Sequence, residues 1–156
     1  MPDWTIDPLR NHTKLIPALA TLHQAEWHAT HPDMSVTDWE NEFFWHILTA
    51  SPTTLVAINA DQQLLGSASL VKDDMEGLAP YSPWLANVLV LPAARGQGIG
   101  AALIDAIAVL ALAQGHPELF LFTSDQQRFY LQRGWIPLED RIHHGVLVSL
   151  MRKPLT

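Results

Sequence analysis

Apolar residues in this chain recur at two spacings, every third or fourth position in some stretches and almost continuously in others. The first spacing is typical of a helix with one buried face, and the second of a buried strand. Turn-forming residues separate these stretches. The pattern predicts a strand at Trp4–Leu9, a helix at His12–His28, a helix capped by Ser35 or Thr37 that reaches Leu48, strands at Thr53–Ile58 and Leu64–Val71, a loop at Lys72–Pro83, a strand at Trp84–Leu91, a helix from Ile99 that ends at Gly115, a strand at Glu118–Thr123, a short helix at Asp125–Arg133 capped by Ser124 or Asp125, and a β hairpin from Gly134 to Arg152.

Length and composition fit one domain. The chain has 156 residues, of which 48% are hydrophobic, and no repeat or linker divides it, so we expect a single domain over residues 1–156. Its formal charge of −7 argues against binding to nucleic acid and favours a cationic partner. The absence of cysteine excludes disulfides, thiolate metal sites and a cysteine nucleophile.

The expected location follows from the same features. No apolar stretch reaches the roughly 18 residues that a membrane span needs, and the N-terminus lacks the basic and apolar pattern of a signal peptide. We therefore expect a cytoplasmic protein with no membrane partner. The eight histidines form no cluster with the spacing of metal ligands, so we expect no metal.

The most informative segment is a glycine-rich loop between a buried strand and a helix. Arg95, Gly96, Gly98 and Gly100 follow the strand Trp84–Leu91 and open the next helix. Backbone N–H groups at the start of a helix have no helical acceptor and attract anions, and glycines allow a phosphate to approach the backbone closely. The loop therefore predicts a phosphate site, to which Arg95 adds a positive charge.

Two common nucleotide sites do not fit this loop. Gly96, Gly98 and Ala101 have the spacing of a dinucleotide fingerprint, but the loop follows several strands and the next strand ends in Thr123 without an acidic residue. A P-loop requires Lys and Ser or Thr after its last glycine, whereas Gly100 is followed by alanines.

Two motifs resemble those of the GNAT superfamily of N-acetyltransferases. Arg95-Gly96-Gln97-Gly98-Ile99-Gly100 matches the superfamily's Gln/Arg-x-x-Gly-x-Gly/Ala pattern, and Phe129-Tyr130 followed by Gly134-Trp135 is similar to its second motif. The resemblance is strong from Leu85 to Trp135 and rests on element order elsewhere. It implies an α+β fold whose mixed, mostly antiparallel central sheet is flanked by helices and splayed at the cofactor strand.

The resemblance also implies acetyl-CoA as the acetyl donor. The loop amides would hold its pyrophosphate, the preceding strand would pair with its pantetheine arm, and Ser124 would stand where the family often has an asparagine, unless it only caps the helix. The implied cofactor-binding residues are Leu89, Val90, Leu91, Arg95, Gly96, Gln97, Gly98, Ile99, Gly100, Ala101, Ser124 and Tyr130.

Two residues are candidates for catalysis. Tyr130 occupies the position from which the family's tyrosine donates a proton to the coenzyme A sulfur, although it can also be a packing residue. Asn87 stands where many relatives have a carboxylate; it can position a water but cannot accept a proton usefully. Deprotonation of the acceptor would then run through water, through a distant acid such as Glu26, or before binding.

The acceptor is expected to be a primary amine, either of a small molecule or of a protein N-terminus. Candidate acceptor residues are Glu26, Trp27, His28, Tyr81 and Trp84, each of which can instead be an ordinary helix-end or core residue. Two rivals are a non-catalytic domain that binds or senses acyl-CoA and a nicotinamide-dependent oxidoreductase. Apolar residues between Ile142 and Leu150 permit a homodimer through the last strands.

Overall fold

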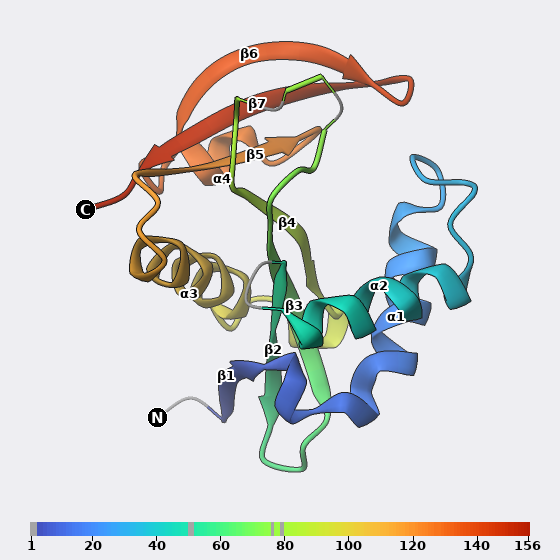
Figure 1. Ribbon diagram of the computed structural model, residues 1–156. Coiled ribbons are helices and arrows are strands. Elements are labelled where there is room, and N and C mark those ends of the chain that lie inside the picture. Colours follow the sequence, from blue (N-terminus) through green and yellow to red (C-terminus); the bar gives the residue numbers. More distant parts are fainter. Residues whose placement is uncertain (1–2, 50–51, 76, 79) are drawn as a thin grey trace.

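The computed structural model describes residues 3–49, 52–75, 77–78 and 80–156. Seven strands form one sheet in the order β1-β2-β3-β4-β5-β7-β6, in which only the β4–β5 contact is parallel (Figure 1). The mixed, mostly antiparallel α+β fold expected from the sequence is confirmed. The elements are β1 Trp4–Pro8, α1 Ile16–Trp27, α2 Val36–Leu48, β2 Thr53–Asn59, β3 Leu64–Val71, β4 Trp84–Val90, α3 Ile99–Ala113, β5 Glu118–Thr123, α4 Gln127–Leu131, β6 Ile136–His143 and β7 Val146–Pro154.

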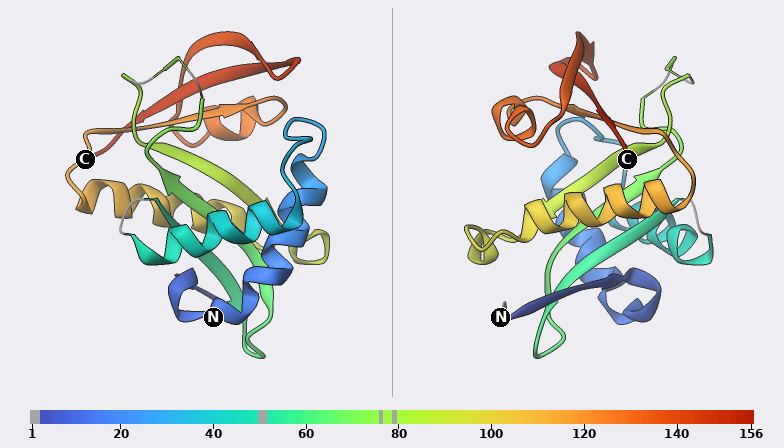
Figure 2. Two further views of the ribbon diagram at one scale, coloured as in Figure 1. Left: turned by 45° about the vertical axis from the view of Figure 1, so that its right-hand side comes forward. Right: turned by 90° about the vertical axis from the view of Figure 1, so that its left-hand side faces the viewer.

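The two faces of the sheet are covered by different helices. In Figure 2, α2 lies in front of the sheet in the left view and α3 lies in front of it in the right view. Apolar residues of α3, such as Leu103 and Ile107, pack with Ala68 and Leu70 of β3. On the other face, residues of α1 and α2 pack against Val56 and other apolar residues of β2. Helix α3 thus buries the apolar face that its spacing predicted. Helix α2 instead buries Trp39, Phe43 and His46 and leaves Phe44 and Leu48 exposed.

Strands β4 and β5 separate soon after they meet. Their register contains a single pair, Trp84 with Phe120, so the sheet is splayed beyond that point. Opposite β3, the register of β4 shifts between the pairs Ser67–Leu89 and Ser69–Ala86, which leaves one extra residue on β4. Asn87 lies in this bulge with a positive φ of 57°. A bulge bends its strand and re-aims a side chain, which here occurs beside the opening between β4 and β5.

Strands β3 and β5 have the predicted bounds, but several other ends differ. The predicted helix at His12–His28 begins only at Ile16, because His12 has a non-helical backbone (φ −139°, ψ 48°) and two short 3-10 turns, η1 Leu9–Asn11 and η2 Thr13–Leu15, precede α1. Strand β4 ends one residue early, and Leu91 instead donates its N–H to the Leu65 carbonyl at 2.9 Å.

The predicted N-terminal cap is confirmed for α2 and wrong for α4. Ser35 caps α2 in a reciprocal capping box with Asp38, as one of the two predicted alternatives. The predicted cap of the short helix by Ser124 or Asp125 is wrong, because the Thr123 hydroxyl accepts the Gln126 N–H at 3.0 Å and α4 starts only after Gln126.

The final hairpin starts two residues later than predicted and continues to Pro154. In the predicted loop at residues 72–83, Glu76 and Ala79 lie outside the described residues. Within the part of the chain that the structure describes, no helix combines the length and the apolar character that crossing a bilayer requires.

Candidate active site

The glycine loop leads directly from the end of β4 into α3. After Val90 the chain makes a short 3-10 turn, η3 Pro92–Ala94, and then passes through two residues with left-handed backbone, Gly96 and Gly98, each at a φ of 82°. A β-carbon at either glycine would meet no atom within 4 Å, so the backbone angle, not crowding, requires glycine here. The loop surface is therefore open to a ligand.

The first amides of α3 follow directly after the loop. Gly98 is the N-cap, and no side chain caps the helix. The first intrahelical bond runs from the Ala102 N–H to the Gly98 carbonyl at 3.1 Å. By helix geometry, the N–H groups of Ile99, Gly100 and Ala101 have no acceptor within the helix. They form a group of donors at the positive end of the helix dipole, where an anion is favoured.

One side chain at the loop is charged, and others line a hollow beside it. Arg95 is exposed, and its Nε donates to the Val90 carbonyl at 3.2 Å, so the guanidinium lies at the end of β4. Gln97 lines a hollow of about 230 Å³ together with Leu91 and Ala94. Ile99 points into the core, and Leu89 is also buried.

Tyr130 lies on α4 with its ring largely buried. It makes edge contacts with Phe129 and Trp135, at centroid distances of 5.2 and 5.7 Å. Burial, assisted by the charge of Asp125, raises the pKa of Tyr130 to about 12. The phenol therefore keeps its proton at neutral pH and has it available to donate. Ser124, just beyond β5, is exposed.

Asn87 projects toward the neighbouring strand. Its side-chain amide is 3.4 Å from the Ser69 hydroxyl of β3, and its backbone lies beside the buried imidazole of His23 on α1. Burial lowers the pKa of His23 to about 4. His23 donates from Nδ1 to the Leu19 carbonyl at 2.8 Å, so it is neutral at pH 7 and fixed in orientation.

The structure does not gather the five predicted acceptor residues. Glu26 and His28 are exposed at the end of α1, whereas the Trp27 ring packs against His23 at a centroid distance of 4.9 Å. Tyr81 stacks on Phe120, and its carbonyl accepts the indole N–H of Trp84. Trp84 is 1% exposed and belongs to the core.

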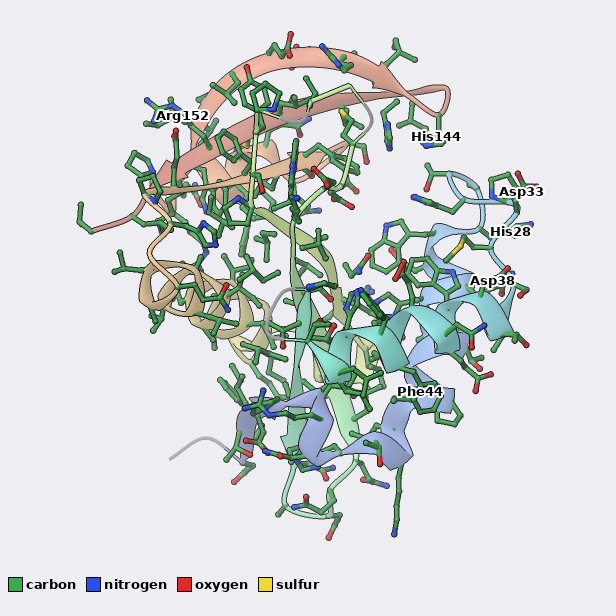
Figure 3. All side chains as sticks on the ribbon, viewed as in Figure 1. His28, Asp33, Asp38, Phe44, His144 and Arg152 are labelled. Atoms are coloured by element: carbon green, nitrogen blue, oxygen red, sulfur yellow. The ribbon has the colours of Figure 1, made fainter. Side chains whose placement is uncertain are left out.

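A pocket of about 470 Å³ instead forms where three loops meet. It lies between the α1–α2 loop, the β3–β4 loop and the tip of the β6–β7 hairpin. Figure 3 shows His144 at the hairpin tip, across from Asp33 and His28 of the segment that follows α1. The pocket is lined by His31, Asp73, Asp74, Met75, Gly77, His143 and His144.

The pocket carries both carboxylates and imidazoles. Burial raises the pKa of Asp74 to about 7. Burial, with a contribution from His144, lowers the pKa of His31, whose ring is 5.4 Å from that of His144. The carboxylates of Asp73 and Asp74 provide acceptors for an ammonium group. Over the described ranges, no group of three or more potential ligands has the arrangement of a metal site.

The candidate acceptor residues named from the sequence do not include Asp73 and Asp74. An Asp-Asp pair after an apolar strand was a usable signal, because loops at strand ends often carry functional residues. The sequence could not show which other loops come together there.

The comparisons with known proteins agree with this geometry. Residues 16–135 match the acetyltransferase (GNAT) family. No curated protein matches the sequence significantly. Among solved structures, an acetyltransferase of the GNAT family from Streptococcus pneumoniae aligns at a TM-score of 0.71 and 15% identity, covering 98% of this chain and 99% of that one.

Two further structures share the fold over nearly the whole chain. YncA from Salmonella typhimurium, solved with its cofactor acetyl-CoA, aligns at a TM-score of 0.74 and 15% identity, over 99% of this chain and 95% of that one. A chimera of the spermidine N-acetyltransferase SpeG from Vibrio cholerae aligns at 0.72 and 16% identity, over 98% and 96%. With the family match spanning most of its length, this chain belongs to the acetyltransferase (GNAT) family.

Proposed function

We propose that this protein transfers an acetyl group from acetyl-CoA directly to a primary amine. The observation that carries the proposal is the loop at the end of β4, whose glycines and unbonded helix amides form a phosphate site beside the opening between β4 and β5. The acetyl-CoA found in YncA supports the same use here. The loop residues fit the diphosphate of acetyl-CoA, because a diphosphate needs hydrogen-bond donors and positive charge and the loop supplies both.

Acetyl-CoA would be held along β4 and the loop. The backbone of Leu89, Val90 and Leu91 would contact the pantetheine arm on the side from which β5 has diverged. Two of its groups already have partners, because the Val90 carbonyl accepts from Arg95 and the Leu91 N–H donates to Leu65. The amides from Gly96 to Ala101 would bind the pyrophosphate, with Arg95 beside them. Gln97 and Ser124 are exposed and would contact the outer parts of the cofactor.

Tyr130 would supply the proton that the departing thiolate needs. Its raised pKa of about 12 keeps the phenol protonated, as a proton donor must be. The neutral amine attacks the thioester carbon, and a carbon–nitrogen bond forms as the carbon–sulfur bond breaks. The sulfur receives the phenolic proton, and the nitrogen gives up one proton that restores the phenol. With no cysteine in the chain and no other activated nucleophile identified, we propose direct attack without an acyl-enzyme.

The acceptor would enter the pocket between the three loops. Asp73 and Asp74 favour a cation there, and the formal charge of −7 favours the approach of one. Both a small amine and the N-terminus of a protein meet this description. Glu26 and His28 lie exposed near the end of α1, outside the pocket lining, and would contact only a larger acceptor.

A second candidate function is binding or sensing of acyl-CoA without turnover. The observation that favours it is the lack of a carboxylate at Asn87, where many relatives have one. Tyr130 opposes it.

Titration calorimetry with acetyl-CoA, followed by free-thiol release with a panel of amines, tests the proposal. Binding with release for one class of amine is the expected result. Binding without release for any small amine or N-terminal peptide would favour the sensor, and no binding would refute the assignment of the loop.

Two glycines at opposite ends of α3 offer a matched control. Gly98 and Gly115 both have a positive φ, 82° and 87°, and open space where a β-carbon would lie. Alanine at either position imposes similar backbone strain of about 1–2 kcal/mol. Only Gly98→Ala should weaken acetyl-CoA binding. Equal weakening by Gly115→Ala would mean that general strain, not the loop, explains the effect.

We further propose that residues 1–156 act as one acetyltransferase domain and form a homodimer through the final hairpin. Ile142 and Leu147 support the dimer, because they are 66% and 59% exposed on the edge strand β6 and on its neighbour β7. Sedimentation of the wild type and of Leu147→Glu tests it. A monomeric wild type would refute it.

A further inference from the structure

A continuous row of polar side chains crosses the face of the sheet beneath α1 and α2. His46 of α2 contacts Thr54 of β2, with 2.7 Å between the ring Nδ1 and the hydroxyl. The Thr54 hydroxyl is 2.8 Å from that of Ser69 on β3, its direct register partner. The Asn87 amide donates to the Ser69 hydroxyl at 3.4 Å. We call His46, Thr54, Ser69 and Asn87 the polar row.

Three members of the polar row are buried among apolar residues. Thr54 and Ser69 are 1% and 0% exposed, and His46 is 4% exposed. Their apolar neighbours on this face include Val56 and Phe43. Because a buried hydroxyl without a partner is costly, each member depends on the next.

The hydrogen bonds of the row run in one direction. Glu42, one turn before His46 on α2, lies 3.6 Å from its Nε2. A carboxylate can only accept, so we assign the imidazole hydrogen to Nε2, which faces Glu42, and the acceptor role toward Thr54 to Nδ1. Thr54 then accepts from Ser69, and Ser69 accepts from Asn87. The buried His23 of α1 is a further titratable group near His46.

The two ends of the row lie in different environments. Glu42 is exposed, which opens the His46 end to solvent. At the other end, Asn87 lies in the bulge of β4, half-buried, beside the point where β4 and β5 diverge. The thioester would lie at this divergence if the proposed function holds. Along this face of the sheet, the polar row thus connects the opening between β4 and β5 with the surface at Glu42.

We propose that the polar row is a proton relay that deprotonates the acceptor amine, an inference that rests on the proposed function. The ammonium group gives one proton to a water bound by Asn87. Ser69 takes a proton from that water and passes its own to Thr54, which passes its own to Nδ1 of His46, and Nε2 releases one to Glu42. The amine then attacks the thioester, and its second proton replaces the one that Tyr130 gives to sulfur. One proton in all leaves by the relay, and His46 provides the acceptor that Asn87 cannot.

Thr54→Val tests the relay, because valine keeps the shape of threonine and removes only the hydroxyl. Its matched control, Thr54→Ser, keeps the hydroxyl and removes a methyl. We expect Thr54→Val to lower kcat by roughly 10²-fold, the lower end of what a positioned proton acceptor contributes. Thr54→Ser should keep most of the activity. Both variants should bind acetyl-CoA with the wild-type Kd.

The dependence of kcat/KM on pH separates a relay from a structural role. The wild type should lose activity in acid, where a relay that is already protonated cannot take the proton of the amine, and Thr54→Val should lack this limb while Thr54→Ser retains it. A Thr54→Val variant with lower Tm but wild-type kcat and pH profile, measured well below its Tm, would overturn the relay alone. A wild type that releases no thiol with any amine would overturn the proposed function and the relay together.

Discussion

Gly66 of β3 is the glycine at which a side chain would most disturb the proposed cofactor strand. A β-carbon there would lie 2.7 Å from the Leu89 carbonyl oxygen and 3.3 Å from Cδ1 of Leu103. The Leu103 methyl can move, but the oxygen belongs to the backbone of β4. Gly66→Ala must therefore push β4 away from β3 by a few tenths of an ångström.

The cost of this substitution has two parts. Overpacking a well-packed site costs about 1–3 kcal/mol. Replacing glycine with alanine in a strand returns roughly 0.5–1 kcal/mol of backbone entropy. We expect a net loss of about 1–2 kcal/mol, which for a chain of this size lowers Tm by about 2–8 °C. Acetyl-CoA binding should weaken too, because Leu89 and Val90 move.

Gly100→Ala is the matched control, a methyl group next to β4 that does not displace the strand. Its β-carbon would meet only Cγ2 of Val90, at an ordinary contact distance of 3.5 Å, so its stability should equal or exceed that of the wild type. Its acetyl-CoA affinity should stay close to that of the wild type, because the pattern that the loop matches accepts alanine at this position. Urea unfolding and calorimetry measure both quantities. A Gly66→Ala protein as stable as the wild type would refute the close contact between β3 and β4.

Three further predictions test individual side chains. Arg95→Ala should weaken acetyl-CoA binding by about tenfold and reduce its dependence on salt, measured by calorimetry at two ionic strengths, because one charged contact to phosphate is lost. Tyr130→Phe should lower the rate of thiol release while acetyl-CoA affinity stays at the wild-type value; an unchanged rate would remove the proton-donor role. Burial lowers the pKa of His23 from 6.5 to about 4. Between these two pH values the unfolded chain binds a proton at this residue that the folded chain does not. The free energy of unfolding must therefore fall as the pH drops, by about 3 kcal/mol in total. Urea unfolding at pH 5 and 7.5 should show a smaller loss for His23→Phe, a comparison that cancels the opposite contribution of Asp74, whose raised pKa favours the folded state at low pH.

The fold and the phosphate loop were readable from the sequence because their signals are local. The alternation of apolar runs and turns located every strand, and the bounds of Leu64–Val71 and Glu118–Thr123 were correct. The glycines of the loop mark left-handed backbone, a property of single residues. Such features depend on neighbours within about four positions, which the sequence displays directly.

Features that depend on competition between partners were not readable in this way. The amide of Gln126 could be capped from several positions, and Thr123 takes it because the end of β5 already fixes that side chain. Trp84 was an equal candidate for the core and for the acceptor site, and only the packing of Phe120 and Phe122 around it decides for the core. The acceptor pocket combines loops that are far apart in sequence, so no single segment identifies it.

The polar row shows why such residues are hard to assign from sequence and informative once placed. Thr54 and Ser69 read as ordinary β formers inside apolar strands, and His46 as one polar position on an amphipathic helix. Their partners are 8, 15 and 18 positions apart, so the row exists only when α2, β2, β3 and β4 are assembled. An apolar row of the same shape would pack without needing any of these hydrogen bonds. Stability alone therefore does not explain why these positions are polar, whereas a path for protons between the β4 bulge and Glu42 does.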